Sequence, residues 1–255
     1  MEVNFYSLII SAVVGVAAGY VGSLMVLKKM ALVGDALSHV ALPGLALGIL
    51  FNFEPFIGAF AFLFVSAVVT WWLERATKLS FEAIIGTLFT LSLAIGIMLV
   101  PEPDLLEALF GDISKVTPFD AVVACIISIS AIYLARIIYD KMILGIISED
   151  LATSHGINVA RVNLVYILLV SLIVAVGIKI VGTLLVGALV IVPAATAKNV
   201  SSNLKRYLAL SSMLGAACSF MGVILSYVVN LPAGPLVVLS GSVIFIATVI
   251  AKASF

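Results

Sequence analysis

The sequence consists mainly of long apolar runs, separated by short stretches in which charged residues, glycine and proline gather. A helix needs about 20 consecutive apolar residues to cross the hydrocarbon core of a bilayer. By this criterion, the pattern predicts nine membrane-spanning helices, at 6–27, 31–51, 56–73, 81–100, 119–138, 162–180, 182–198, 206–229 and 235–252. The two runs on either side of Lys179 are short, so one broken or partial span, and a total of eight, is the alternative.

Composition supports this interpretation. Of the 255 residues, 64% are hydrophobic and 10% are charged, whereas a soluble domain carries about 25% charged residues. No polar stretch is long enough for a second folded domain, so we expect one all-α polytopic membrane domain over residues 1–255, a bundle of 8–9 transmembrane helices. The N-terminus lacks the basic segment of a cleaved signal peptide, and the first span is expected to stay in the membrane.

Lysine and arginine predict the orientation of this bundle. Cytoplasmic connectors of membrane proteins carry an excess of these residues. If the N-terminus lies outside and nine spans alternate, eleven basic residues fall on the cytosolic side and only Lys115 and Lys179 fall outside. The sequence therefore predicts a multi-pass protein with its N-terminus outside and, with nine spans, its C-terminus in the cytosol.

One apolar run places three polar side chains on a single helical face. Asp35, Ser38 and His39 stand at positions i, i+3 and i+4 of the second predicted span. Ionisable groups at membrane depth are costly and are functional by default. One carboxylate with one imidazole suits zinc, manganese or ferrous iron better than calcium or copper(I). The pattern favours a polar cavity with a cation site formed by Asp35 and His39, and an Asp–His pair that only joins helices is the alternative.

Two prolines are expected to interrupt helices. Pro43 removes a backbone donor and clashes with the carbonyl of His39, so the second span should kink or break just past His39, at Pro43 and Gly44. Pro193 should interrupt the seventh span in its middle, where the Thr196 hydroxyl can satisfy freed backbone groups.

The predicted outer connectors offer further oxygen atoms. Asn230, in the last outer turn, offers a neutral oxygen. The connector at 101–118 carries four carboxylates that could attract cations, or it is an ordinary solvated loop with a short helix. The weaker candidates for metal contact are Ser38, Thr196 and Asn230.

The longest predicted cytosolic connector, 139–161, should contain a short helix at about 149–155. Ser148 can cap its start, acidic residues suit its first turn, and Gly156 can end it in the left-handed conformation. This helix is either a plain interfacial helix or a docking element for another subunit. His155 is expected to be solvated rather than to bind metal.

Several motifs of enzymes are absent from the sequence. It contains no GxxxxGK[ST] loop, no HExxH and no basic patch interleaved with aromatic residues, so ATP hydrolysis, zincin chemistry and nucleic-acid binding are not expected. Ser38 beside His39 does not make a nucleophilic triad. Transport fits this inventory better than catalysis. The rivals are a proton-coupled secondary metal carrier, an intramembrane hydrolase and a purely structural subunit.

Five segments, in order, resemble the bacterial and archaeal zinc/manganese/iron ABC permeases, the ABC-3 metal transporter family. They are GDALSHVALPG (34–44), ALFGDI (108–113), SEDLATSHGINV (148–159), KIVGTLLVGALVIVPAATA (179–197) and LPAGP (231–235). Because the matches extend over about 200 residues, the resemblance is far more specific than any single short motif.

The resemblance implies a helical fold similar to that of the vitamin B12 permeases, in the prokaryotic cell (inner) membrane. It implies a second copy of the permease, forming a homodimer, two cytosolic ABC ATPase subunits that hydrolyse ATP, and an extracytoplasmic metal-binding protein. The transported ion would be divalent Zn, Mn or Fe, with no permanently bound cofactor. Asp35 and His39 correspond to the signature residues of the metal pathway, and family members often carry an acidic residue where Asn230 stands. The segment that couples to the ATPase corresponds to Glu149, Asp150, Leu151, Ala152, His155 and Gly156.

Overall fold

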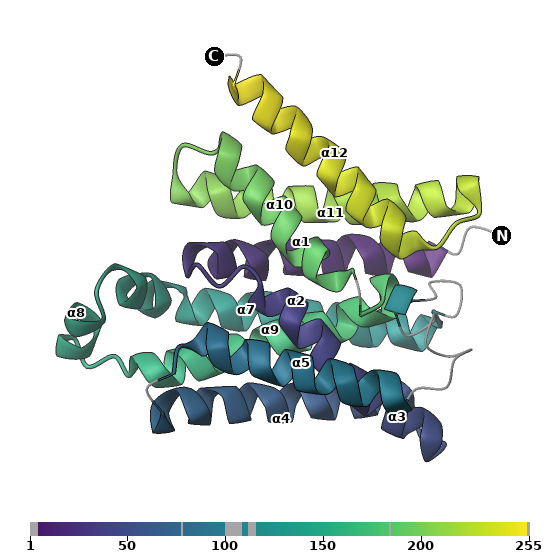
Figure 1. The fold of residues 1–255 in the computed structure, drawn as a ribbon. Coiled ribbons are helices and arrows are strands. Elements are labelled where there is room, and N and C mark those ends of the chain that lie inside the picture. Colours follow the sequence, from purple (N-terminus) through teal and green to yellow (C-terminus); the bar gives the residue numbers. More distant parts are fainter. Residues whose placement is uncertain (1–4, 78, 100–108, 112–115, 184, 254–255) are drawn as a thin grey trace.

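The computed structural model describes residues 5–77, 79–99, 109–111, 116–183 and 185–253. Within these ranges the chain forms helices and short turns, without a strand, which confirms the all-α class (Figure 1). The helices are α1 (Phe5–Leu27), α2 (Val33–Val40), α3 (Leu42–Leu50), α4 (Pro55–Ala76), α5 (Phe81–Leu99), α7 (Pro118–Ile147), α8 (Glu149–Ser154), α9 (Val159–Val181), α10 (Val186–Val200), α11 (Leu204–Val229) and α12 (Ala233–Ala253). The four carboxylates predicted in the 101–118 connector lie outside the described residues.

All nine predicted spans are helical in the described part of the chain. Eight helical segments are long and apolar enough to cross a membrane, with α2 and α3 together counted as Val33–Leu50. The ninth, α10, has only 15 residues. Lys179 does not shorten its helix, because it lies in the last turn of the 23-residue α9. Figure 1 shows α1 starting at one end of the bundle and α12 finishing at the opposite end.

The first helix lies at the centre of the bundle and packs against α7, α9, α10 and α11. Its glycines let the neighbouring backbones come close, as small residues do between membrane helices. A Cβ added at Gly15, Gly19 or Gly22 would collide with a backbone oxygen of α11 or α10. The buried hydroxyl of Tyr166, on α9, donates a hydrogen bond to the carbonyl of Val21 at 2.9 Å. These contacts make α1 the scaffold on which the other helices are placed.

The second span is interrupted just past His39. Its first half, α2, ends at Val40, and its second half, α3, begins at Leu42 with Pro43 in the first turn. Gly44, which was named with Pro43 in this prediction, follows it in the first turn of α3 and packs against the backbone of Gly58 on α4. The interruption separates the polar face of α2 from the apolar α3.

The prediction of a helix break at Pro193 is also wrong, because α10 is continuous from Val186 to Val200 with Pro193 inside it. Proline is tolerated within membrane helices where neighbouring helices surround it, and α10 packs against α1, α2, α11 and α12. The Thr196 hydroxyl donates to the carbonyl of Val192 at 2.7 Å. Pro193 has no N–H to donate to the carbonyl one turn earlier in the helix. The Thr196 hydroxyl does not reach that carbonyl.

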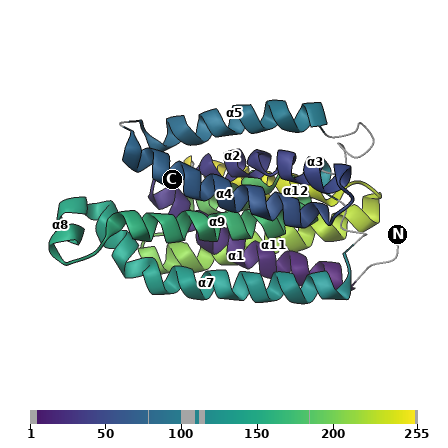
Figure 2. The same ribbon diagram turned by 90° about the horizontal axis from the view of Figure 1, so that it is seen from below.

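Helix α7 extends further than the predicted span 119–138. It begins with a capping box, in which Thr117 and Asp120 exchange hydrogen bonds, and it runs for 30 residues to Ile147. At about 1.5 Å per residue it is longer than the hydrocarbon core is thick. Its last turns therefore carry the short helix α8 beyond the rest of the bundle (Figures 1 and 2). The segment 139–147, predicted as connector, is helical in the structure, and the helix ends at Ser148, whose backbone is extended.

Candidate functional site

The polar face predicted in the second span lies on α2, about midway between the two ends of the bundle (Figure 1). The eight-residue α2 carries Asp35 in its first turn and His39 in its last. It packs against α4, α5, α9 and α10. The candidate residues thus lie at mid-depth among several helices, which is where binding sites of membrane transporters are typically found.

His39 is buried, and one of its ring nitrogens has no hydrogen-bond partner. The side chain is 7% exposed, and Nδ1 is without a partner among the described residues. The imidazole meets the ring of Phe89 on α5 edge-on, with 5.1 Å between ring centroids and an angle of 67° between their planes. Buried polar atoms are nearly always paired, and an exception calls for an explanation such as a functional role. The unpaired nitrogen is available to a ligand.

Asp35 lies against the backbone of α10. A Cβ placed on Gly187 would be 2.6 Å from both Cα and Oδ1 of Asp35. The two helices can approach this closely only because residue 187 has no side chain. Asp35 is partly exposed, in contrast to His39. Neither Gly187 nor Phe89 could be predicted from the sequence, since nothing in a single chain marks which glycine or aromatic residue faces a given carboxylate or imidazole.

The three weaker candidates have other roles in the structure. Ser38 is fully buried and its hydroxyl donates to the carbonyl of Asp35 at 2.6 Å. Thr196 stands nine residues after Gly187, about 13 Å further along α10, so it is not brought to Asp35. Asn230 is exposed and caps α11 in the left-handed conformation (φ 56°), which asparagine tolerates well. Within the described residues, no group of three or more His, Cys, Asp or Glu side chains could hold a metal.

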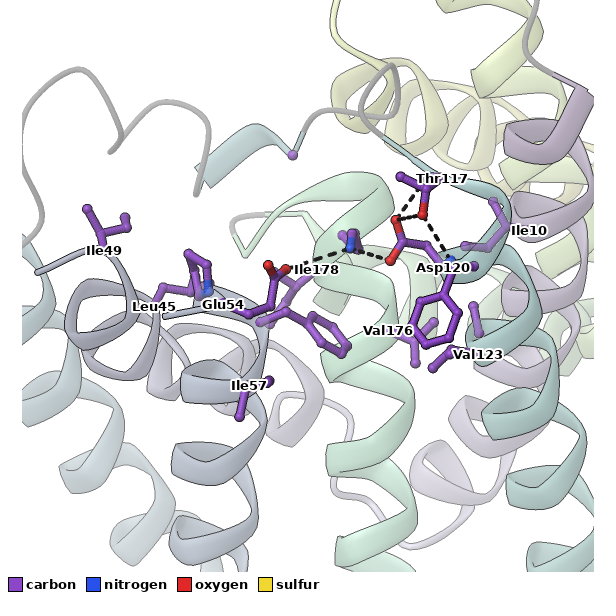
Figure 3. Close-up of a pocket in the computed structure, with 16 residues that line it drawn as sticks. Ile10, Leu45, Ile49, Glu54, Ile57, Thr117, Asp120, Val123, Val176 and Ile178 are labelled. Atoms are coloured by element: carbon purple, nitrogen blue, oxygen red, sulfur yellow. Dashed lines mark hydrogen bonds and ion pairs between the residues drawn. The ribbon is translucent and has the colours of Figure 1, made fainter. Parts of the chain in front are cut away.

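A cavity lined by described residues lies away from this pair. It has a volume of about 830 Å³ and is lined by residues of α1, α3, α4, α7 and α9, including neither Asp35 nor His39 (Figure 3). At its mouth, Lys179 Nζ lies 2.6 Å from Asp120 Oδ1 and 3.9 Å from Glu54 Oε1. The other carboxylate oxygen of Asp120 accepts hydrogen bonds from the backbone N–H and the hydroxyl of Thr117.

We call this extremity of the bundle the Lys179 end, and the opposite one the α8 end. The ion pair at the Lys179 end joins α9 to α7 across 59 positions of sequence. It was not predicted, although both residues were expected at outer ends of spans. The apolar walls of the cavity and its rim of charges distinguish it from a polar metal passage.

The short helix α8 forms as its residues predict. The Ser148 hydroxyl accepts a hydrogen bond from the backbone N–H of Leu151 at 3.2 Å, and Gly156 follows the helix with φ of 76°. The helix packs against the ends of α7 and α9, burying Ala152 while Leu151 stays 43% exposed. His155 is exposed, with Nδ1 2.8 Å from the Leu151 carbonyl oxygen. The remaining residues predicted to couple, Glu149 and Asp150, are also exposed.

Comparison with known proteins finds relatives that are named for manganese or zinc transport. The manganese transport system membrane protein MntC of Listeria innocua is 33% identical over 243 residues, which cover 94% of this chain and 87% of MntC. The manganese import system permease protein ScaB of Streptococcus gordonii is 33% identical, with 95% of this chain and 88% of ScaB covered. The high-affinity zinc uptake system membrane protein ZnuB of Buchnera aphidicola is 28% identical, with 97% of each chain covered.

Solved structures and a family model agree with these relatives. PsaBC from Streptococcus pneumoniae in complex with Fab superposes with a TM-score of 0.84 at 31% identity, covering 97% of this chain and 92% of the other. An inward-facing conformation of a putative metal-chelate type ABC transporter shares the fold, with a TM-score of 0.81 at 19% identity and coverage of 96% and 85%. The model of the ABC 3 transport family matches residues 1–252, and the chain therefore belongs to the ABC 3 transport family.

Proposed function

We propose that this chain is the membrane permease subunit of an ATP-driven importer for a divalent transition metal, Zn, Mn or Fe. The family match and the relatives, which are named for manganese and zinc transport, support this function. In the importer, two copies of the chain assemble with two ATPase subunits at the α8 end. An extracytoplasmic metal-binding protein delivers the ion at the Lys179 end, where α1 also begins.

The observation that carries this proposal is the unpaired, buried Nδ1 of His39 one helical turn from a carboxylate. In the proposed mechanism, Asp35 and neutral His39 hold the ion transiently while it passes between α2, α5 and α10. A metal ligand must be deprotonated, so His39 binds only as the neutral imidazole. Two protein ligands are fewer than the four of a closed structural site, and the ion can therefore leave as readily as it arrives.

The packing of α9 supports a route from ATP hydrolysis to this site. Its first residues follow α8 after a short turn, and its body packs against both α2 and α7. Closure of the ATPase subunits would push α8, and a shift of α9 would move the helix that carries Asp35 and His39. In this route the exposed face of α8 around Leu151 is the docking element.

Flux measurements in proteoliposomes test the proposed function against the secondary-carrier alternative. The permease is reconstituted with its ATPase, ATP is enclosed on the ATPase side, and the delivery protein loaded with manganese or zinc is added outside. The proposal predicts metal uptake that requires enclosed ATP and the ATPase. Uptake driven by a pH gradient in vesicles without the ATPase would contradict it.

A further inference from the structure

A second cavity, of about 320 Å³, lies at the α8 end of the bundle, where the ends of α1, α7, α8 and α9 meet. Its polar lining consists of Lys28, Lys29, Lys141, Glu149 and Asn163. Three ammonium groups face a single carboxylate, which leaves the cavity with a net positive charge. Neither the proposed metal site nor the docking face of α8 uses these lysines.

Lys28 is the least solvated of the three lysines. It is partly buried, and its Nζ donates to the Oδ1 of Asn163 at 2.6 Å. It also lies 5.6 Å from the centroid of the Tyr166 ring. No carboxylate of the described residues lies within 4.0 Å of it. Burial lowers the pKa of Lys28 more than the more distant charges of Glu74 and Glu149 raise it, so its charge is incompletely compensated.

Neighbouring side chains indicate the depth of this cavity in a bilayer. Lys28 directly follows α1, the first span. Trp71, near the same end of α4, donates its ring N–H to the carbonyl of Ala160, two residues into α9, and Trp72 is 60% exposed. Tryptophan concentrates at the level of the lipid headgroups. The cavity is therefore level with the phosphate groups of the adjacent leaflet.

We propose that this cavity binds the phosphate group of an anionic phospholipid. Basic pockets between transmembrane helices bind such headgroups. Lys28 lies deepest in the site, and the exposed Lys29, two residues past α1, and Lys141, on α7, approach the phosphate. Ile146, which also lines the cavity, and the 71% exposed Ile147 offer apolar contact to an acyl chain. The bound lipid would hold α8 to the ends of α1 and α7, and this inference does not depend on the metal site.

The test is native mass spectrometry of the purified permease, alone and with its ATPase, after addition of equimolar phosphatidylglycerol and phosphatidylcholine. One variant carries Lys29→Ala and Lys141→Ala, and a matched control carries Lys205→Ala and Lys252→Ala. All four lysines are exposed, so neither pair disturbs the fold. We expect the wild type and the control to retain phosphatidylglycerol in preference to phosphatidylcholine. The cavity variant should bind phosphatidylglycerol roughly tenfold more weakly.

Three outcomes would overturn the lipid assignment. The first is equal binding of phosphatidylglycerol by the cavity variant and the control, or no preference over phosphatidylcholine. The second is complete displacement of the lipid by inorganic phosphate at millimolar concentration, which would assign the cavity to a soluble anion. The third is loss of the bound lipid on assembly with the ATPase, which would assign the lysines to an acidic surface of that partner.

Discussion

Gly187 of α10 lies directly against Asp35 of α2. A Cβ at position 187 would lie 2.6 Å from the Oδ1 and 2.7 Å from the Cβ of Asp35. Real Cβ atoms do not tolerate contacts this short, and one of the two helices would have to move. The absence of a side chain on α10 therefore determines where the carboxylate of the proposed metal site can lie.

The first prediction concerns this contact. Gly187→Ala should displace Asp35 and reduce metal uptake at least tenfold, with an overpacking cost of about 1–3 kcal/mol in stability. Gly86→Ala on α5 is the matched control, because a Cβ there meets nothing within 4 Å. Uptake and thermal unfolding of both purified variants give the comparison. Equal uptake by the two variants would show that the position of Asp35 is unimportant.

The second prediction concerns the ion pair at the Lys179 end. Lys179→Met and Asp120→Asn should each destabilise the protein, because each removes the link between α9 and α7. The two side chains are 28% and 18% exposed, so a double-mutant cycle should give a coupling of about 1 kcal/mol, near the upper limit for exposed pairs. The coupling free energy is measured from the unfolding of the wild type, the two single variants and the double variant in detergent. Strictly additive effects would mean that the pair contributes nothing to joining the helices.

The third prediction concerns the docking role of α8. Glu149→Lys with Asp150→Lys should lower recovery of the ATPase when the tagged permease is purified, since both side chains are exposed on α8. Glu82→Lys serves as the control, because Glu82 is likewise exposed and lies in the first turn of its helix, α5. Unchanged recovery of the ATPase by the α8 variant, with ATP hydrolysis still coupled to transport, would rule out this role.

The fourth prediction concerns pH. If neutral His39 binds the metal, binding should weaken as the pH is lowered from about 8 to about 5, because the protonated imidazole cannot coordinate. The chain has two histidines, and the second, His155, is exposed on the turn after α8. His155→Gln should keep the pH dependence of the wild type. Titration of metal into the wild type and the His155→Gln variant at several pH values measures the pH dependence of binding. Loss of this pH dependence in the His155→Gln variant would contradict the proposal.

Much of this architecture could be predicted from local sequence. Hydropathy located the helices because a bilayer requires long apolar segments, and Ser148 and Gly156 marked α8 because caps act within one turn. The interruption at Ala41 followed from Pro43. The effect of Pro193 could not be predicted in this way. The helices packed around α10 keep it continuous despite the proline.

The partners of the candidate residues could not be predicted in the same way. Gly187 is one of 19 glycines, and only the packing of α10 on α2 shows that it faces Asp35. The contact between Phe89 and His39 and the pair formed by Lys179 and Asp120 join segments 50 and 59 residues apart. The pattern of a single chain gives the faces of helices but not which faces meet.

Metal uptake by conservative variants tests the central claim most directly. Asp35→Asn and His39→Gln keep the size of each side chain but remove, respectively, the charge and the imidazole nitrogen. In proteoliposomes with the ATPase and the loaded delivery protein, the account predicts that each variant assembles normally and loses ATP-dependent manganese or zinc uptake by at least tenfold. Uptake by the Asp35→Asn, His39→Gln double variant at the wild-type rate would contradict it.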